Sequence, residues 1–117
     1  MIAIVEDDVA VRNSLEFTLG ARGYDVCAYA CADDALGSPI PGGADCFVID
    51  YNLPDRDGVA LLQEMRRRRE TCPAILIASN PVARCRQGAQ ASRTLLLEKP
   101  LIGGILEQTI DRLLQSG

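Results

Sequence analysis

The chain has 117 residues, of which 48% are hydrophobic and 24% are charged, and its formal net charge is −4 at pH 7. This length and composition are typical of one globular domain with a hydrophobic core of its own. The negative charge disfavours direct binding to nucleic acids or anionic membranes, and the apolar stretches are far too short to span a bilayer.

The N-terminal sequence and the use of cysteine and histidine limit the location and the kinds of site that are possible. Met1 leads through Ile-Ala-Ile-Val straight into acidic residues without a basic region, so we expect no secretory signal and a cytoplasmic location. The five cysteines are scattered, and the chain has no histidine. This pattern disfavours a Cys/His zinc site and excludes Ser-His or Cys-His nucleophilic catalysis built from this chain alone.

Short apolar segments of strand length alternate with helix-like segments in the first half of the chain. Asp8 is a predicted helix N-cap, and Gly20 or Gly23 is predicted to end that helix. The Ser-Pro-Ile-Pro-Gly-Gly segment (38–43) is a chain breaker. The predicted elements, in chain order, are a strand over 2–5, a helix to about Leu19, a strand over 24–29, a weak helix over 32–36 and a strand over 46–49.

The second half continues the alternation. Apolar residues in the last predicted helix recur at helical spacing, whereas residues 81–91 are polar and contain a glycine, so any helix there should be weak. The predicted elements are a loop over 51–57, a helix over 58–68, a strand over 74–78, the weak helix within 81–91, a strand over 94–97 and a helix over 102–114.

This alternation predicts an α/β fold: a doubly wound (βα)5 arrangement in which helices cover both faces of a five-stranded parallel sheet. Ligands bind such sheets beyond the carboxyl ends of the strands. The chemistry of this chain is therefore expected where the predicted strands end.

Acidic residues follow two of these strands. Glu6, Asp7 and Asp8 come directly after the first strand, and Asp50 ends the third. If the two strands are neighbours, these carboxylates converge and repel one another unless a cation compensates. Oxygen ligands without His or Cys suit Mg²⁺, with Mn²⁺ as an alternative. Taken alone, each acid is more simply a helix cap or a surface residue.

Of the 12 lysine and arginine residues, Lys99 is the only lysine. It follows the fifth predicted strand, which brings it to the same end of the sheet. A dication and one ammonium group beside a carboxylate form a site for a doubly charged phosphoryl group, with Asp50 as the nucleophile. A compact ammonium acts there as a point charge, without the fixed fork geometry of arginine.

Three segments together resemble the chemotaxis-Y-like receiver domain of response regulators, the phosphoacceptor module of two-component signalling. They are Ile-Val-Glu-Asp-Asp (4–8), Val-Ile-Asp-Tyr-Asn-Leu-Pro-Asp-Arg-Asp-Gly (48–58) and Glu-Lys-Pro (98–100). The resemblance implies a single receiver domain over residues 1–117, a flavodoxin-like sheet with strand order 2-1-3-4-5, and a switch rather than an enzyme.

Residue by residue, the resemblance implies that Asp50 accepts the phosphoryl group and that Lys99 contacts it. Asp7 and Asp50 would bind Mg²⁺, Glu6 would assist through a water molecule, and the backbone carbonyl of Asn52 would be a further ligand. The donor would be a phosphohistidine on a sensor histidine kinase or a histidine phosphotransfer protein, or a small acyl phosphate. A downstream output domain or protein would receive the signal.

The resemblance also implies structural roles beside the site, with a cis peptide bond between Lys99 and Pro100. The residues in these roles are Pro54, Asp57, Gly58 and Pro100.

Two positions depart from the family pattern. The fourth strand of a receiver usually ends in a Thr or Ser that bonds the phosphoryl group, but here that position is Ala78, with the hydroxyl displaced to Ser79. A Tyr or Phe usually lies three residues before the lysine, and here that residue is Leu96. Both parts of the usual conformational switch are therefore altered.

Two alternative functions remain open from the sequence. A degenerate receiver that acts as a constitutive interaction module would fit Ala78 and Leu96, and a small Mg²⁺-dependent phosphatase would use the same aspartyl phosphate. The arginine run 66–69 is more simply a solvated helix end than a binding patch. The last helix and its surroundings also offer a surface for a homodimer, and the sequence gives neither the kinase nor the output.

Overall fold

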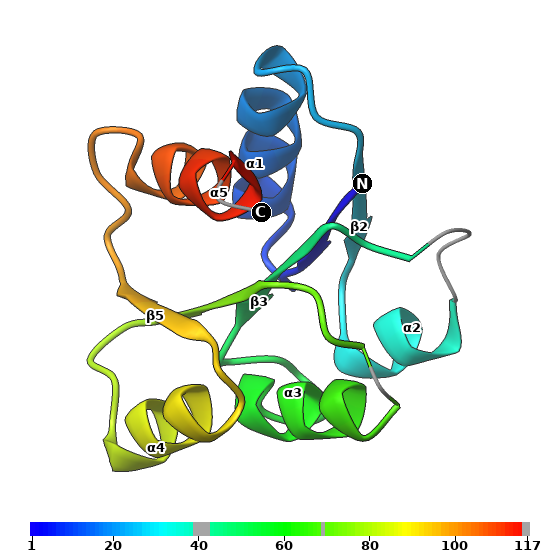
Figure 1. Cartoon of the computed structure of the whole chain (residues 1–117), viewed down its shortest axis with the longest axis vertical. Coiled ribbons are helices and arrows are strands. Elements are labelled where there is room, and N and C mark those ends of the chain that lie inside the picture. Colours follow the sequence, from blue (N-terminus) through cyan, green and yellow to red (C-terminus); the bar gives the residue numbers. More distant parts are fainter. Residues whose placement is uncertain (39–42, 69, 116–117) are drawn as a thin grey trace.

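The computed structural model describes residues 1–38, 43–68 and 70–115, within which five strands and five helices alternate (Figure 1). In chain order the elements are β1 (Ile2–Val5), α1 (Val9–Ala21), β2 (Val26–Tyr29), α2 (Ala32–Gly37), β3 (Cys46–Asp50), α3 (Gly58–Arg67), β4 (Ala74–Ala78), α4 (Ala83–Ala91), β5 (Leu95–Glu98) and α5 (Ile105–Gln115). Residues 39–42 of the predicted breaker segment, Arg69 of the arginine run and residues 116–117 lie outside the described residues.

The five strands form one parallel sheet in the order β2-β1-β3-β4-β5, which confirms the predicted doubly wound fold. The inner strands β1, β3 and β4 are buried along their whole length, whereas the edge strands β2 and β5 are partly exposed. This difference follows from the sequence, because a strand covered on both faces needs a continuous apolar run.

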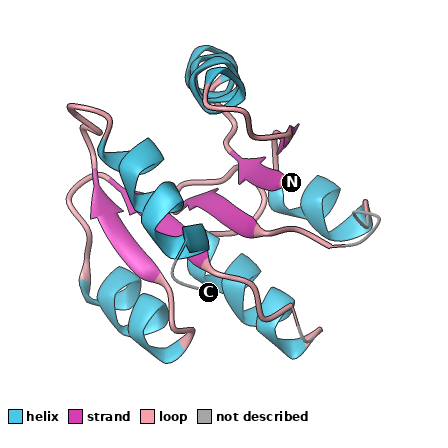
Figure 2. Cartoon of the chain, turned by 45° about the horizontal axis from the view of Figure 1, so that its top comes forward, coloured by secondary structure: helices cyan, strands magenta, loops and turns pink. Residues whose placement is uncertain are grey.

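Helices cover both faces of the sheet: α1 and α5 lie on one face, and α2, α3 and α4 lie on the other (Figures 1 and 2). Side chains along β1 alternate between these two layers. Ile2 and Ile4 pack under α1 and α5, whereas Ala3 and Val5 pack on the opposite side. The sheet therefore separates two hydrophobic clusters, and its carboxyl end lies between the two helical layers.

The ends of α1 follow the expected capping chemistry. The carboxylate of Asp8 accepts hydrogen bonds from the backbone N–H groups of Ala10 and Val11 at 2.9 and 3.2 Å, as predicted for an N-cap. The other end is a Schellman motif, in which Gly23 adopts a φ of +94°. Gly23, not Gly20, therefore ends this helix, and α1 extends past the predicted Leu19.

The weak helix predicted within 81–91 is present as α4, and its buried residues are small. The last helix begins at Ile105 instead of residue 102, because Gly103 and Gly104 have φ values of +67° and +72°. These left-handed conformations interrupt the helix that the apolar spacing predicts.

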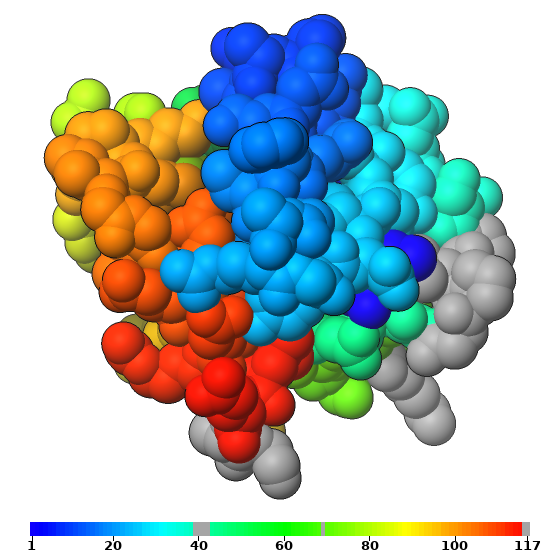
Figure 3. All heavy atoms as spheres, turned by 90° about the horizontal axis from the view of Figure 1, so that it is seen from above, coloured from blue at the N-terminus to red at the C-terminus, as the bar shows by residue number. Residues whose placement is uncertain are grey.

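Figure 3 looks onto the face where α1 lies beside the segment between β5 and α5. Phe17 of α1 and Ile102 of that segment are 77% and 74% exposed.

Along the described part of the chain, none of the helices combines the length and the apolar character needed to cross a membrane.

Candidate functional site

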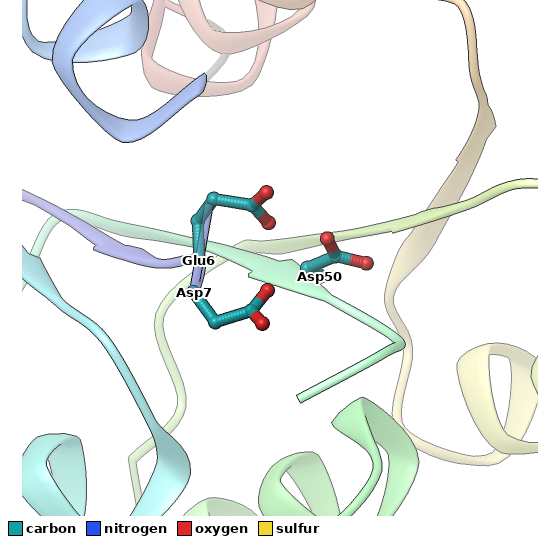
Figure 4. A group of neighbouring side chains, drawn as sticks. All are labelled: Glu6, Asp7 and Asp50. Carbon is teal, nitrogen blue, oxygen red and sulfur yellow. The ribbon is translucent and has the colours of Figure 1, made fainter. Parts of the chain in front are cut away.

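Three carboxylates meet at the carboxyl end of the sheet (Figure 4). Val5 of β1 is paired with Ile49 of β3, so the residues that follow them, Glu6 and Asp50, lie level with each other. Asp7 comes next on the β1–α1 loop. One oxygen from each of the three side chains lies within 4.8 Å of the other two. The predicted convergence of these acids is therefore present in the structure.

Asp50 is held at both carboxylate oxygens. Its Oδ1 accepts a hydrogen bond from the backbone N–H of Asn52 at 3.0 Å, and its Oδ2 accepts one from Lys99 Nζ at 2.9 Å. The Asp50 side chain is only 6% exposed, while that of Lys99 is 31% exposed. The carboxylate is thus fixed in one orientation beside a cation, with an open side at Lys99.

Lys99 follows the edge strand β5 and reaches Asp50 across the end of β4. Its backbone N–H donates to the carbonyl oxygen of Ala78 at 2.9 Å, which fixes the residue at the end of β4 although it follows β5. The side chain then extends to Asp50 on β3. The peptide bond between Lys99 and Pro100 is cis, as the resemblance implied.

The electrostatics of the site show an excess of negative charge. Burial raises the pKa of Glu6 to about 8, and its hydrogen bond to Asp50 and the charge of Asp50 act in the same direction. Burial opposes ionisation of Asp50, but hydrogen bonds with Glu6, Lys99 and Asn52 hold its pKa below the usual value. Burial likewise opposes the charge of Lys99, yet its hydrogen bond to Asp50 leaves its pKa raised.

This group of oxygens fits a hard divalent cation. Lys99 balances one of the carboxylates, and the pKa of Glu6 is raised first by burial and then by its hydrogen bond to Asp50 and the charge of Asp50. A dication would balance the remaining charge, and carboxylate oxygens without nitrogen or sulfur ligands suit Mg²⁺. Asp7 is exposed and Glu6 is buried, so a metal held here would be open to solvent on the side of Asp7.

Arg12 of α1 supports the acidic loop, which the sequence analysis did not foresee. One guanidinium nitrogen donates to the backbone carbonyl oxygens of Glu6 and Asp7 at 2.8 and 3.4 Å. The arginine therefore holds the backbone of both acids without contacting their carboxylates. Only the tertiary arrangement reveals this role, because an arginine in a helix carries no local signal of its own.

The β3–α3 loop, residues 51–57, connects the site to two helices. Asp57 caps α3 by accepting a hydrogen bond from Ala60 N–H at 2.8 Å, and Gly58 lies directly against Asp50: a Cβ at Gly58 would be 2.7 Å from the Asp50 carbonyl oxygen. Asn52 and Pro54 are exposed on this loop. The loop thus holds its shape through contacts at both of its ends.

Of the altered switch positions, Ala78 and Leu96 lie on one side of the sheet, and Ser79 lies on the side of α1. Ala78 is fully buried in the cluster beneath α3 and α4, and Leu96 packs against the same cluster. Ser79 is exposed and lines a groove with Lys99 and residues of α1. Ser79 follows the last residue of β4 and lines a groove beside α1, so its hydroxyl does not occupy the buried position of Ala78.

Comparison with known protein families assigns the chain. A family model for the response regulator receiver domain matches residues 2–111. The chain belongs to this family. Its strand order is that of a flavodoxin-like receiver domain, as the resemblance implied.

Individual relatives support the assignment. The receiver domain is 28% identical over 116 residues to the transcriptional regulatory protein AfsQ1 of Streptomyces coelicolor, a match that covers 99% of this chain and 52% of AfsQ1. It is 30% identical over 111 residues to the sensor histidine kinase RcsC of Salmonella typhimurium, covering 94% of this chain and 12% of RcsC. The chain thus spans about half the length of AfsQ1 and a small part of RcsC.

The fold also matches a solved receiver from Thermotoga maritima, the response regulator TrrA in complex with Mg²⁺-BeF. The two structures superpose with a TM-score of 0.83 at 21% identity, over 96% of each chain. Receiver domains occur in response regulators and in sensor kinases, so this domain acts in two-component signalling. Domains of this family are phosphoacceptor switches rather than classical enzymes, and they bind Mg²⁺ at an acidic pocket.

Proposed function

We propose that this receiver domain, as one unit over residues 1–117, accepts a phosphoryl group on Asp50 in a Mg²⁺-dependent reaction. The observation that carries the proposal is the buried carboxylate of Asp50, which lies between Lys99 and the two acids that follow β1. A carboxylate used as a nucleophile needs a fixed orientation and nearby positive charge, and both are present here.

The transfer itself forms a bond between an Asp50 carboxylate oxygen and phosphorus and breaks the bond between phosphorus and its donor atom. The donor is a phosphohistidine on a sensor histidine kinase or a histidine phosphotransfer protein, since this chain has no histidine. Lys99 lies 2.9 Å from Asp50 Oδ2 and therefore contacts the transferred group once the new bond has formed. Its ammonium offsets negative charge on the phosphoryl oxygens.

Asp7, Asp50 and the backbone carbonyl of Asn52 would hold the metal directly, and Glu6 would assist through a water molecule. When bound, Mg²⁺ would supply positive charge that offsets the charge of the carboxylates and of the phosphoryl group. The TrrA structure with Mg²⁺-BeF supports this reading by family likeness, with the acidic cluster as the local evidence.

A degenerate receiver that binds a partner constitutively is the second candidate. Ala78 favours it, because this fully buried residue offers no hydroxyl to a phosphoryl group. The intact Asp50–Lys99 pair favours the phosphoacceptor. The two candidates differ in whether Asp50 reacts, which a direct experiment decides.

The test is to incubate the protein with acetyl phosphate and Mg²⁺ and to record its intact mass. We expect one phosphoryl adduct, because the site supplies the nucleophile, the cation ligands and Lys99. The adduct should be absent after EDTA treatment and in Asp50→Asn, which keeps the shape of the side chain but lacks the nucleophilic carboxylate.

A matched control is Asp45→Asn, since Asp45 is an exposed acid near the start of β3 that pairs with the terminal amine of Met1. This variant should be phosphorylated like the parent protein. If no adduct forms from acetyl phosphate or from a phosphorylated histidine phosphotransfer domain, and Mg²⁺ does not bind, the phosphoacceptor proposal is wrong and the constitutive module is favoured.

A further inference from the structure

The β3–α3 loop touches Asp50 at one end and a second helix at the other. Asn52 N–H donates to the Asp50 carboxylate, and Gly58 N–H donates to the carbonyl oxygen of Tyr51 at 2.8 Å, which closes the loop on itself. A change at the Asp50 carboxylate therefore acts directly on the start of this loop. Its other end is Asp57.

Asp57 joins the loop to α4 through a two-point ion pair. Nε of Arg84 donates to Oδ2 of Asp57 at 2.7 Å, and a terminal guanidinium nitrogen donates to Oδ1 at 3.1 Å. This paired geometry fixes the direction as well as the distance between the two groups. Arg84 therefore ties the end of the loop to α4.

The rest of α4 is only lightly anchored. Its buried residues are Cys85, Gly88 and Ala89, and its N-cap residue, Val82, offers no side-chain hydrogen bond to the helix. Gly88 lets the helix approach α3 closely, since a Cβ there would be 2.5 Å from Val59. Few large apolar side chains hold this helix, so its position depends strongly on individual polar contacts.

The alternative route through the strands lacks polar side chains at the two switch positions. Ala78 and Leu96 occupy the positions between the site and α4 on β4 and β5, and both pack in the apolar cluster. Neither side chain can form or lose a hydrogen bond when the charge at Asp50 changes, and the hydrogen bond from Lys99 N–H reaches only the backbone carbonyl of Ala78. The loop therefore offers a connection from Asp50 to α4 through side chains, among the residues that the structure describes.

We propose that the Asp57–Arg84 pair transmits the phosphorylation state of Asp50 to α4, in place of the side chains at positions 78 and 96. This inference rests on the proposed phosphoacceptor function and adds the path of the signal. A phosphoryl group on Asp50 would order the loop through Asn52, whose carbonyl would also hold the metal, and this would keep Asp57 in place and prolong its contact with Arg84. Amide exchange in α4 then slows on phosphorylation.

A second contact of the loop provides an internal reference. Asp55 accepts hydrogen bonds from the N–H groups of Ala32 and Asp33 at 3.0 and 2.8 Å, so it caps the start of α2. This link does not involve Arg84. Amides at the start of α2 therefore report the ordering of the loop even when the connection to α4 is cut.

The experiment is hydrogen–deuterium exchange on the full chain, with and without acetyl phosphate and Mg²⁺, and with intact mass recorded on the same samples. The test variant is Arg84→Gln. The control is Arg86→Gln, which removes the same charge from the same helix but from a residue that donates to the Pro81 carbonyl oxygen. All three proteins should carry the same level of adduct.

We expect phosphorylation to slow exchange in α4 of the parent protein and of Arg86→Gln. In Arg84→Gln, exchange in α4 should be about two- to fivefold faster before phosphorylation and should not slow afterwards, while α2 still responds. Equal slowing of α4 in Arg84→Gln, or no slowing in a phosphorylated parent protein, would overturn the inference alone. If no adduct forms from acetyl phosphate or from a phosphorylated histidine phosphotransfer domain, and Mg²⁺ does not bind, the proposed function is overturned together with this inference.

Discussion

Glu6 has a raised pKa because it is buried beside the charged Asp50. Its buried carboxyl group shares a hydrogen bond with Asp50, and its pKa lies far above that of an ordinary glutamate. At neutral pH the group therefore keeps its proton while the site holds no dication. A metal that needs the negative charge of this group must displace that proton, which links metal affinity to pH.

We predict that Mg²⁺ binds more tightly as the pH rises through 8. With the pKa of Glu6 at about 8, binding should be about tenfold weaker at pH 7 than at pH 9, because at the lower pH most molecules must release a proton first. Isothermal titration calorimetry in two buffers of different ionisation enthalpy measures both the affinity and the proton released.

Glu6→Gln is the matched variant for this prediction. Glutamine keeps the size of the side chain and cannot titrate, so its Mg²⁺ affinity should vary little between pH 7 and pH 9 and no proton should be released. Equal pH dependence in the parent and in Glu6→Gln would show that another group takes up the proton.

The sequence alone identified the residues whose place in the chain is enough to locate them. Asp50 and Lys99 come directly after predicted strands, so the rule that parallel strands end together predicted their meeting. Arg12, Asp55 and Arg84 were missed, because their partners are backbone groups or side chains that only the folded chain brings near. An arginine on an exposed helix face has no local pattern that distinguishes a brace from a solvated charge.

At the scale of elements, the closest contact near the site is the start of α3 against β3. A Cβ at Gly58 would lie 2.7 Å from the Asp50 carbonyl oxygen and 2.9 Å from Tyr51 Cα. Both neighbours are backbone atoms, one at the last residue of β3 and one at the residue that follows it. Neither can move without shifting the candidate phosphoacceptor, so the site depends on a glycine at this position.

Gly58→Ala should therefore lower the free energy of unfolding by about 2–3 kcal/mol. The control is Gly20→Ala in α1, where a Cβ meets nothing within 4 Å. That change should stabilise the protein by up to about 1 kcal/mol, because alanine favours a helix more than glycine does. Denaturant unfolding followed by circular dichroism measures both, and a neutral Gly58→Ala would contradict the close approach.

The bounds of an element could be predicted where the pattern of apolar residues in the sequence matched the residues that the fold buries. The continuous apolar runs of β1, β3 and β4 were located correctly, because strands buried on both faces cannot alternate. The spacing of apolar residues predicted that the last helix begins at residue 102. The observed helix begins at Ile105, because the two residues before it, Gly103 and Gly104, are left-handed. The helix within 81–91 was predicted only as weak, because the small residues that it buries, Cys85, Gly88 and Ala89, give little hydrophobic signal.

At the scale of the whole molecule, the site joins separate parts of the sheet. Glu6 and Asp7 follow β1, Asp50 ends β3, and Lys99 follows β5, so a ligand at this point contacts residues nearly a hundred positions apart in sequence. The unfolded chain cannot hold these groups together. A metal that binds here therefore stabilises the fold as a whole.

Mg²⁺ at 100 times its dissociation constant should raise the free energy of unfolding by about 2.7 kcal/mol. Asp7→Asn removes one candidate ligand from an exposed position, so at the same Mg²⁺ concentration the gain should fall to about half or less. Thermal unfolding at pH 8 measures both, with NaCl at matched ionic strength as the control for screening. An equal gain from NaCl would show that the ion acts only through general screening.

The bond between Lys99 and Asp50 also makes the protein its own chemical reporter. Lys99 is the only side-chain amine in the chain. Its contact with Asp50 raises its pKa and keeps it as an ammonium ion, which does not react with amine-selective acylating reagents. Any event that removes this contact lowers the pKa of Lys99 toward its ordinary value and increases the fraction of free amine, so the rate of labelling at this one native side chain reports whether the contact is intact.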